Sequence, residues 1–186
     1  MTAKKIYGLL VLFCLAGYAV GSDYVTQNPY KVEAAFLRNF AHYVTWPENT
    51  FSDSASPWNI CVLGSDPFGK ILETTLKNRT EQGRGFKVFR AESIEMLPSC
   101  QMVFIAYKDP KKRQAALNVL KEKNVLTVSD APGFLREGGV IQFQVNDRVH
   151  MNINLDQARA VSLSIQTKML EVSSAVLEDG VFRKMR

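Results

Sequence analysis

Residues 59–78 read NICVLGSDPFGKILETTLKN, and this stretch decides the fold class. Its apolar start at 59–63 predicts a buried strand, its glycine- and proline-bearing centre predicts a tight turn, and the apolar spacing of 67–78 predicts a helix. A strand, a tight turn and a helix in this order form the repeating unit of parallel α/β sheets.

The same stretch has the spacing G-x-x-x-x-G-K of a phosphate-binding loop, but its side chains do not suit that role. Ile71 stands where the motif requires a hydroxyl group for magnesium, and Pro67 lacks a backbone N–H that would face phosphate. Asp66 adds a negative charge to the supposed anion site. We therefore interpret the stretch as a tight turn whose glycines allow a helix to begin close to the sheet.

The chain continues the same alternation of strands and helices. Runs such as CVL (61–63) and MVFIA (102–106) are apolar without polar alternation, which is typical of parallel strands covered on both faces, whereas the last two strands alternate and predict a hairpin. This pattern predicts an α/β fold, a three-layer α/β/α sandwich with a mostly parallel central sheet and a C-terminal antiparallel hairpin and helix. The expected strands are 59–63, 86–91, 101–107, 125–129, 140–145 and 149–155, with a helix at 110–123.

Two further helices are expected at the two ends of the domain. Residues 30–46 place apolar and aromatic side chains at three- and four-residue spacing and stop at a proline, as an amphipathic helix does. A final helix is expected from about Asp156, as its N-terminal cap, to Val176, and residues 181–186 are expected to fray. No internal repeat or linker interrupts the chain, so residues 22–186 are expected to form a single domain.

The beginning of the chain has the pattern of a cleaved signal peptide. Two lysines precede an apolar core from Ile6 to Tyr18, and small residues follow up to Gly21. The apolar core is shorter than a membrane-spanning helix requires. We therefore expect residues 1–21 to direct export and to be removed.

Two cysteines, Cys61 and Cys100, remain once Cys14 leaves with the signal peptide. An even pair in an oxidising compartment is most simply a disulfide, and two buried free thiols are the alternative. The formal net charge of +5 is mild and does not require a polyanionic partner. We expect an exported protein with no nucleic acid partner.

The sequence offers little that is typical of an active site. Its two histidines, His42 and His150, lie on separate expected elements. No H-E-x-x-H, C-x-x-C, G-x-S-x-G or paired-carboxylate motif accompanies them. We therefore expect a protein that is not an enzyme, with no catalytic residues, no metal site and no cofactor.

Several sequence blocks in a fixed order resemble the YfiR family, which is also classified as a domain of unknown function. The resemblance covers nearly all of residues 22–186 and includes the turn GSDPFG, which it explains as part of a strand–turn–helix signature. The blocks are VEAAFLRNFAHYVTWP (32–47), ICVLGSDPFG (60–69), CQMVFIA (100–106), VLTVSDAPGFLREGGVIQF (125–143) and VHMNINLDQARAVSL (149–163).

The resemblance implies a role in regulation. YfiR-like proteins are periplasmic negative regulators that bind the periplasmic sensor region of a membrane diguanylate cyclase, repress cyclic-di-GMP synthesis and restrain biofilm formation. The resemblance also implies a homodimer, and Cys61 and Cys100 match the family's main cystine. A second cystine of some members has no counterpart here, because no further cysteine remains. From another class, a periplasmic small-molecule-binding protein serving a transporter or a sensor kinase remains the alternative.

A ligand crevice is expected where the strand order reverses. If the first four strands lie in the order 2-1-3-4, the reversal falls between the strands that end at Leu63 and Tyr107. The loops that follow would then line a crevice, with Asp66, Lys70 and Tyr107 as candidate contacts to a small ligand. The alternative is a groove that holds only solvent. The same order makes neighbours of the strands that carry the two cysteines.

A contact surface is expected on the final helix. Arg159, Gln166 and Leu170 are its candidate contacts to a partner or to a second copy, because exposed apolar stripes usually mark interfaces. The alternative is that this helix packs entirely onto the sheet. We expect its C-terminal portion to serve self-association, while separate loops hold the cyclase.

Overall fold

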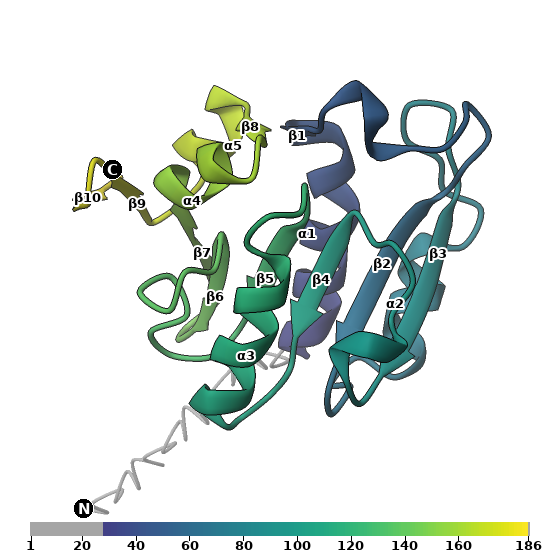
Figure 1. The fold of residues 1–186 in the computed structure, drawn as a ribbon. Coiled ribbons are helices and arrows are strands. Elements are labelled where there is room, and N and C mark those ends of the chain that lie inside the picture. The colour runs from purple at the N-terminus through teal and green to yellow at the C-terminus, as the bar shows by residue number, and fades with distance from the viewer. Residues whose placement is uncertain (1–27, 186) are drawn as a thin grey trace, which may run out of the picture.

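An eight-stranded mixed sheet organises residues 28–185, the part of the chain that the computed structural model describes (Figure 1). The expected signal peptide at 1–21 lies outside this part. The sheet consists of β2 (Trp58–Leu63), β3 (Phe86–Ala91), β4 (Met102–Ile105), β5 (Leu126–Ser129), β6 (Ile141–Val145), β7 (Val149–Asn154), β9 (Ala175–Glu178) and β10 (Val181–Lys184). Their order across the sheet is β10-β9-β7-β6-β5-β4-β2-β3.

The pairing of the strands confirms the expected fold class. The neighbours β3, β2, β4 and β5 are parallel, which is the predicted order 2-1-3-4. β6 joins β5 in parallel, and β7 pairs antiparallel with β6 to form the predicted hairpin. The sheet is therefore mixed and mostly parallel.

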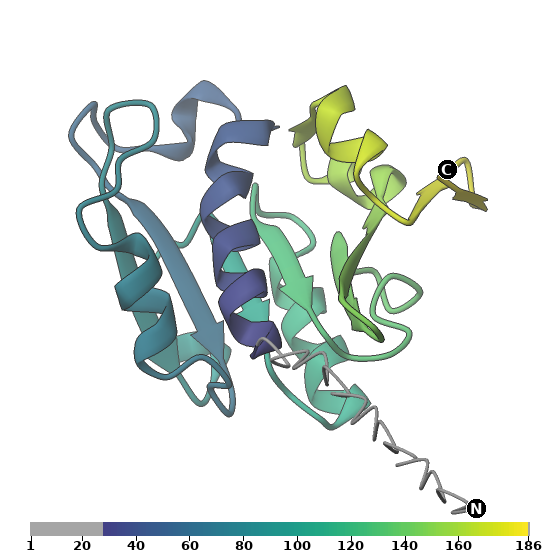
Figure 2. The ribbon, with the colours of Figure 1, turned by 180° about the vertical axis from the view of Figure 1, so that it is seen from behind.

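Helices cover both faces of the sheet, which gives the three layers (Figures 1 and 2). The three longest helices of the described part are α1 (Pro29–Tyr43), α2 (Lys70–Leu76) and α3 (Pro110–Leu120), with short 3-10 turns at Glu48–Thr50 and Ile94–Met96. Successive residues of a strand point to opposite faces, so Ile60 and Val62 join the core under α1 and α2, whereas Cys61 and Leu63 join the core under α3. None of the helices within residues 28–185 combines the length and apolar character needed to cross a lipid bilayer.

The predicted single helix at 156–176 is wrong, because the segment breaks into three short elements. These are α4 (Leu155–Ala160), β8 (Ser164–Ile165) and α5 (Thr167–Glu171). Ser162 adopts a positive φ of 58°, and Leu163 N–H donates to the carbonyl of Ala158 at 2.8 Å. This left-handed capping motif ends α4 after its second turn.

Asp156 and the C-terminal tail also differ from the prediction. The N-terminal cap of α4 is Asn154, whose side chain accepts from Gln157 N–H at 2.9 Å. Asp156 instead accepts the backbone N–H groups of Asp179 and Gly180, both at 2.9 Å. Those two residues form the turn between β9 and β10, so most of the tail that was expected to fray is a strand.

A second, two-stranded sheet joins distant parts of the chain. β1 (Val44–Thr45) follows α1 directly and pairs antiparallel with β8. Gln166 N–H donates to the carbonyl of Tyr43 at 3.0 Å and continues this ladder. The first helix therefore ends earlier than residue 46, and the C-terminal segment holds its end in place.

Candidate functional site

A groove of about 520 Å³ lies at the carboxyl ends of β2, β4 and β5. β2 continues through α2 to one side of the sheet, and β4 continues through α3 to the other side. Ligands of open α/β sheets bind where strand connections diverge in this way. The predicted crevice is therefore present in shape. Its lining includes Tyr30, Asp66, Tyr107, Lys108, Arg113 and Asp130.

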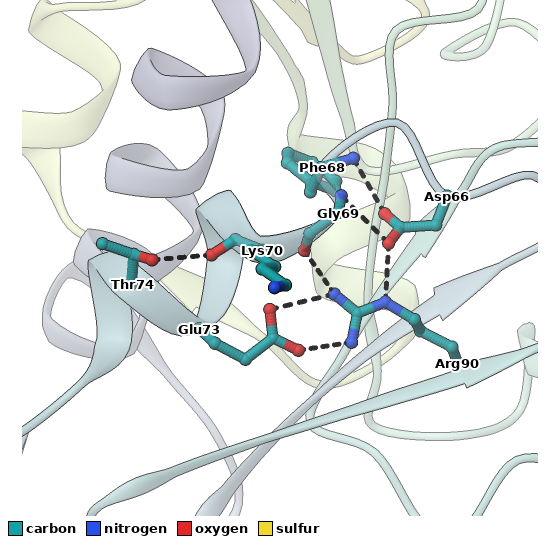
Figure 3. A network of polar contacts seen from close by, with 7 residues as sticks. All are labelled: Asp66, Phe68, Gly69, Lys70, Glu73, Thr74 and Arg90. Atoms are coloured by element: carbon teal, nitrogen blue, oxygen red, sulfur yellow. Dashed lines mark hydrogen bonds and ion pairs between the residues drawn. The ribbon is translucent and has the colours of Figure 1, made fainter.

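Asp66 is held in place by the turn that it closes and by an arginine (Figure 3). Its carboxylate accepts the backbone N–H groups of Phe68 at 2.8 Å and Gly69 at 3.1 Å. Arg90 Nε donates to the same carboxylate at 2.6 Å and links it to Glu73 on α2. The hydrogen bonds from Arg90 lower the pKa of Glu73. Asp66 therefore lines the groove and also joins the β2–α2 turn to β3.

Tyr107 also has a structural role at the edge of the groove. Its hydroxyl donates to the carbonyl of Glu92 at 2.5 Å, and burial, followed by the charges of Glu92 and Glu95, raises its pKa. Gly64 has a φ of +94°, and a Cβ there would come within 2.7 Å of Tyr107 Cδ1. The glycine after β2 therefore allows the aromatic ring to lie against the backbone.

Lys70 lies outside the groove, so the structure brings only two of the three candidate ligand contacts together. It is the first residue of α2 and is exposed. The figure shows its backbone carbonyl accepting from Thr74, one turn later, at 2.8 Å (Figure 3).

Arg113 fixes the loop after β4 from beneath. It is 4% exposed and donates to the carboxylate of Glu137 at 2.8 and 2.6 Å. It also donates to the carbonyls of Tyr107 and Lys108 at 3.0 and 2.8 Å. Neighbouring carboxylates, chiefly Glu137, raise its pKa. All of these contacts are internal, so Arg113 shapes the groove without offering it a free charge.

A buried acid lies next to the groove, and the sequence analysis missed it. Glu33 on α1 is 0% exposed, and neither of its carboxylate oxygens has a hydrogen-bond partner. Burial, followed by the charge of Asp130, raises the pKa of Glu33 to about 8. Its spacing from Leu37 and Ala41 was a signal, because residues four apart share a helix face and those two are buried.

Tyr30 and Asp130 complete this acidic side of the groove. Tyr30 lies one turn before Glu33 on α1, and its hydroxyl donates to Asp130 Oδ2 at 3.5 Å. Burial and the charges of Asp130 and Glu33 raise the pKa of Tyr30. Three acidic or phenolic groups therefore lie close together where β5 ends and α1 begins.

The expected disulfide is confirmed on the other face of the sheet. Cys61 of β2 and Cys100, just before β4, are joined, with their Cα atoms 6.1 Å apart. Both belong to the core under α3. The alternative of two free thiols is excluded, and the bond fastens neighbouring strands as the predicted order requires.

The candidate contact residues of the C-terminal segment make internal contacts. Arg159 donates to Glu178 at 2.6 Å, Gln166 donates through its side chain to the carbonyl of His42 at 3.1 Å, and Leu170 packs partly buried against the main core. A groove of about 420 Å³ lies beside them between α1 and α5. Its lining includes Phe36, Tyr43, Lys168, Met169, Glu171 and the exposed Val172.

The histidines lie apart and in separate contacts. His42 pairs with Glu81 at 2.8 Å, and His150 contacts Asp147 and Ser174, both at 3.0 Å. Across residues 28–185, no three side chains of the types that hold metal ions come together.

A comparison with protein families places most of this architecture in one group. A family model described as YfiR/HmsC-like matches residues 30–174, from the first turn of α1 to the residue before β9. The comparison with curated proteins gave no match.

Proposed function

Because the chain belongs to the YfiR/HmsC-like family, we propose that it represses a membrane-bound diguanylate cyclase by binding the cyclase's periplasmic sensor region. The family is one of periplasmic regulators of cyclic-di-GMP signalling, and it is a regulatory rather than an enzymatic family. The match over residues 30–174 is the observation that carries the proposal.

Repression of this kind requires binding and no chemistry. A regulator that binds the inactive state of its partner more tightly than the active state shifts the population toward the inactive one. The internal engagement of Asp66, Tyr107 and Arg113 supports this mode of action, because these side chains hold loops in fixed positions. A rigid set of loops then offers the cyclase a defined surface, at little entropic cost on binding.

We also propose that the protein forms a homodimer through its C-terminal segment. In this dimer a second copy binds at the groove between α1 and α5. Val172 is 68% exposed beside that groove, which is a large exposure for an apolar side chain. Lys168 and Glu171 line the same groove with opposite charges. In a twofold contact each copy presents the same patch, so Lys168 of one copy can face Glu171 of the other. Gln166 and Leu170 are neighbours in sequence of the lining residues Lys168, Met169 and Glu171, whereas Arg159 is paired with Glu178 of β9, so Arg159 stays a more distant candidate.

Deletion of the gene tests repression directly. We expect cyclic-di-GMP to rise in the deletion strain, and we expect no rise when the gene for the partner cyclase is also deleted. An equal rise in both strains, or no rise in either, would contradict the proposal. Affinity purification of the tagged protein from membranes identifies the cyclase to delete.

A ligand-binding protein that serves a transporter or a sensor kinase is the second candidate. The groove of about 520 Å³ at the reversal of strand order favours it, because such crevices commonly hold small molecules. Asp66 and Tyr107 are the proposed contacts, and Lys70 is a more distant one. Substitution of Asp66 by Asn should weaken binding while the fold persists. A neighbouring gene for a receptor or a histidine kinase would favour this candidate over repression.

A further inference from the structure

Glu33 is the least satisfied polar group near the groove. Both of its oxygens are buried without a partner, and a buried carboxyl group that forms no hydrogen bond is unfavourable. Most such groups in folded proteins have a partner, so an unsatisfied one calls for a specific explanation. Glu33 does not itself line the groove, but Tyr30, one turn before it on α1, and Asp130 both do, and the charge of Asp130 raises the pKa of Glu33.

The cations around the groove do not compensate these acids. Arg113 is close enough for the charge of Asp130 to raise its pKa, but its guanidinium donates to Glu137 and to two backbone carbonyls. Lys108 also lines the groove and is exposed. Among residues 28–185, no ion pair joins Asp130 or Glu33 to a cation. The acids of α1 and of the end of β5 therefore lack an ion-pair partner within residues 28–185, although the charge of Arg113 acts on Asp130 from α3.

We propose that this groove binds a small organic ammonium ion, with Asp130 as its ion-pair partner and with the buried Glu33 responding to it through the charge of Asp130. The location is that of the ligand-binding candidate above, on which this site rests, and binding does not depend on a cyclase. The rings of Tyr30 and Tyr107 line the same groove, and aromatic rings favour ammonium ions.

Other ligand classes fit this groove less well. An anion would meet Asp66 and Asp130, with the solvent-exposed Lys108 as the one cation of the lining that has no ion pair within residues 28–185. A divalent metal ion requires several oxygen or nitrogen ligands at short range, and no cluster of three such side chains occurs in the same residues. An ammonium group instead needs one carboxylate at contact distance and tolerates an aromatic lining.

Binding in this position is coupled to the loss of a proton. An ammonium ion beside Asp130 offsets the charge repulsion that acts on Glu33, although burial, the larger cause of the raised pKa, remains. Binding therefore lowers the pKa of Glu33 and releases part of a proton. The groups that act on Glu33 are Tyr30 from its own helix and Asp130 from the end of β5, with Arg113 facing Asp130 from α3. The affinity should therefore rise with pH up to about 8, the pKa of Glu33 in the protein without ligand.

Isothermal titration of the mature protein tests the site. The probes are butylamine, 1,4-diaminobutane and the neutral butanol, each titrated in two buffers that differ in ionisation enthalpy. We expect the two amines to bind with release of protons and butanol to bind at least about tenfold more weakly, since loss of one ion pair costs about that factor.

Two substitutions separate the roles of the carboxylates. Asp130→Asn should weaken amine binding by about tenfold or more, whereas Glu33→Gln should retain binding but abolish both proton release and the pH dependence. Glu122→Gln, an exposed acid on the loop after α3, is the matched control and should change neither property. If Asp130→Asn does not fold, Glu33→Gln and the buffer comparison on the unchanged protein still decide the outcome.

Several results would overturn the site. These are equal binding of butylamine and butanol, amine binding without proton release, or displacement of the amine by millimolar magnesium or calcium chloride. Normal amine binding with unchanged cyclic-di-GMP in the deletion strain would support the site while refuting repression. Absence of amine binding together with raised cyclic-di-GMP in the deletion strain would refute the site and leave repression supported.

Discussion

The disulfide between Cys61 and Cys100 acts on stability through the unfolded chain. It closes a loop across a sequence separation of 39 residues, and such a constraint stabilises a protein by about 4 kcal/mol in the chain-entropy model. We predict that the free energy of unfolding of the Cys61→Ala, Cys100→Ala double variant falls by about 2–4 kcal/mol. Urea denaturation of the oxidised protein, of the protein in reductant and of the variant measures it. A loss below about 1 kcal/mol would show that the unfolded chain is already compact.

Glu33 gives the stability of the protein a defined pH dependence. Its pKa rises from the ordinary 4.5 to about 8 on folding, so the folded state binds the proton more tightly than the unfolded state. The contribution of Glu33 to stability is therefore greatest below the unfolded pKa, falls as the pH rises from 4.5 to about 8, and changes no further above that. The total loss from this one group is at most about 5 kcal/mol.

The measurement is urea denaturation at pH 5, 7 and 9 of the unchanged protein and of Glu33→Gln. We predict that the variant loses most of the slope between pH 5 and 8 and is the more stable protein at pH 9. Glu122→Gln, an exposed acid on the loop after α3, should keep the slope. Equal slopes in the Glu33→Gln variant and the unchanged protein would show that Glu33 ionises normally in the folded state.

At the scale of the element, Asp156 holds the hairpin of β9 and β10 against α4. Its carboxylate accepts two backbone N–H groups of the turn at 179–180, and these bonds lower its pKa. We predict that Asp156→Ala raises the hydrogen-exchange rates of those two amides by about tenfold while exchange in β2 and β4 stays unchanged. Asp53→Ala is the matched control, because Asp53 also accepts two backbone N–H groups, those of Ala55 and Ser56, in a loop before β2, and its loss should leave the hairpin unaffected.

The elements of the parallel half of the sheet were predictable from the sequence. The strands β2 and β4 carry apolar runs that are typical of strands covered on both faces, and turn residues separate them from helices. The crevice followed from strand order, and two of its three candidate residues, Asp66 and Tyr107, lie at it. These features depend on local sequence and on general rules of α/β folds.

The C-terminal elements and the proximity of Glu33 to Asp130 were not predictable in the same way. The left-handed Ser162 has no sequence signal as strong as glycine would give, and it divides an apparently continuous helical pattern. The pairing of β8 with β1 and of β9 with β7 depends on distant partners. Glu33 and Asp130 lie far apart in sequence, so only the tertiary fold brings their charges together.

At the scale of the whole molecule, the groove between α1 and α5 is the predicted surface for a second copy. A charge placed at Val172 would be buried in that contact, which is unfavourable without a partner. We predict that Val172→Glu raises the dimer dissociation constant at least about tenfold. Analytical ultracentrifugation measures the change, and Val119→Glu on the exposed side of α3 is the matched control. An equal effect of both variants would place self-association elsewhere.

The small β1–β8 ladder sets the order in which this chain can finish folding. It fastens the end of α1 to residues 164–166, so the contact spans more than a hundred residues and closes late. A chain that emerges from its N-terminus can align β2, β3 and β4 and close its disulfide well before that partner arrives. Until then the end of the first helix lacks its clamp. A chain stopped before residue 164 would therefore contain β2 to β7 but would lack the β8 partner that holds the end of α1. Chaperones and proteases would then meet a largely formed sheet with an exposed helix end.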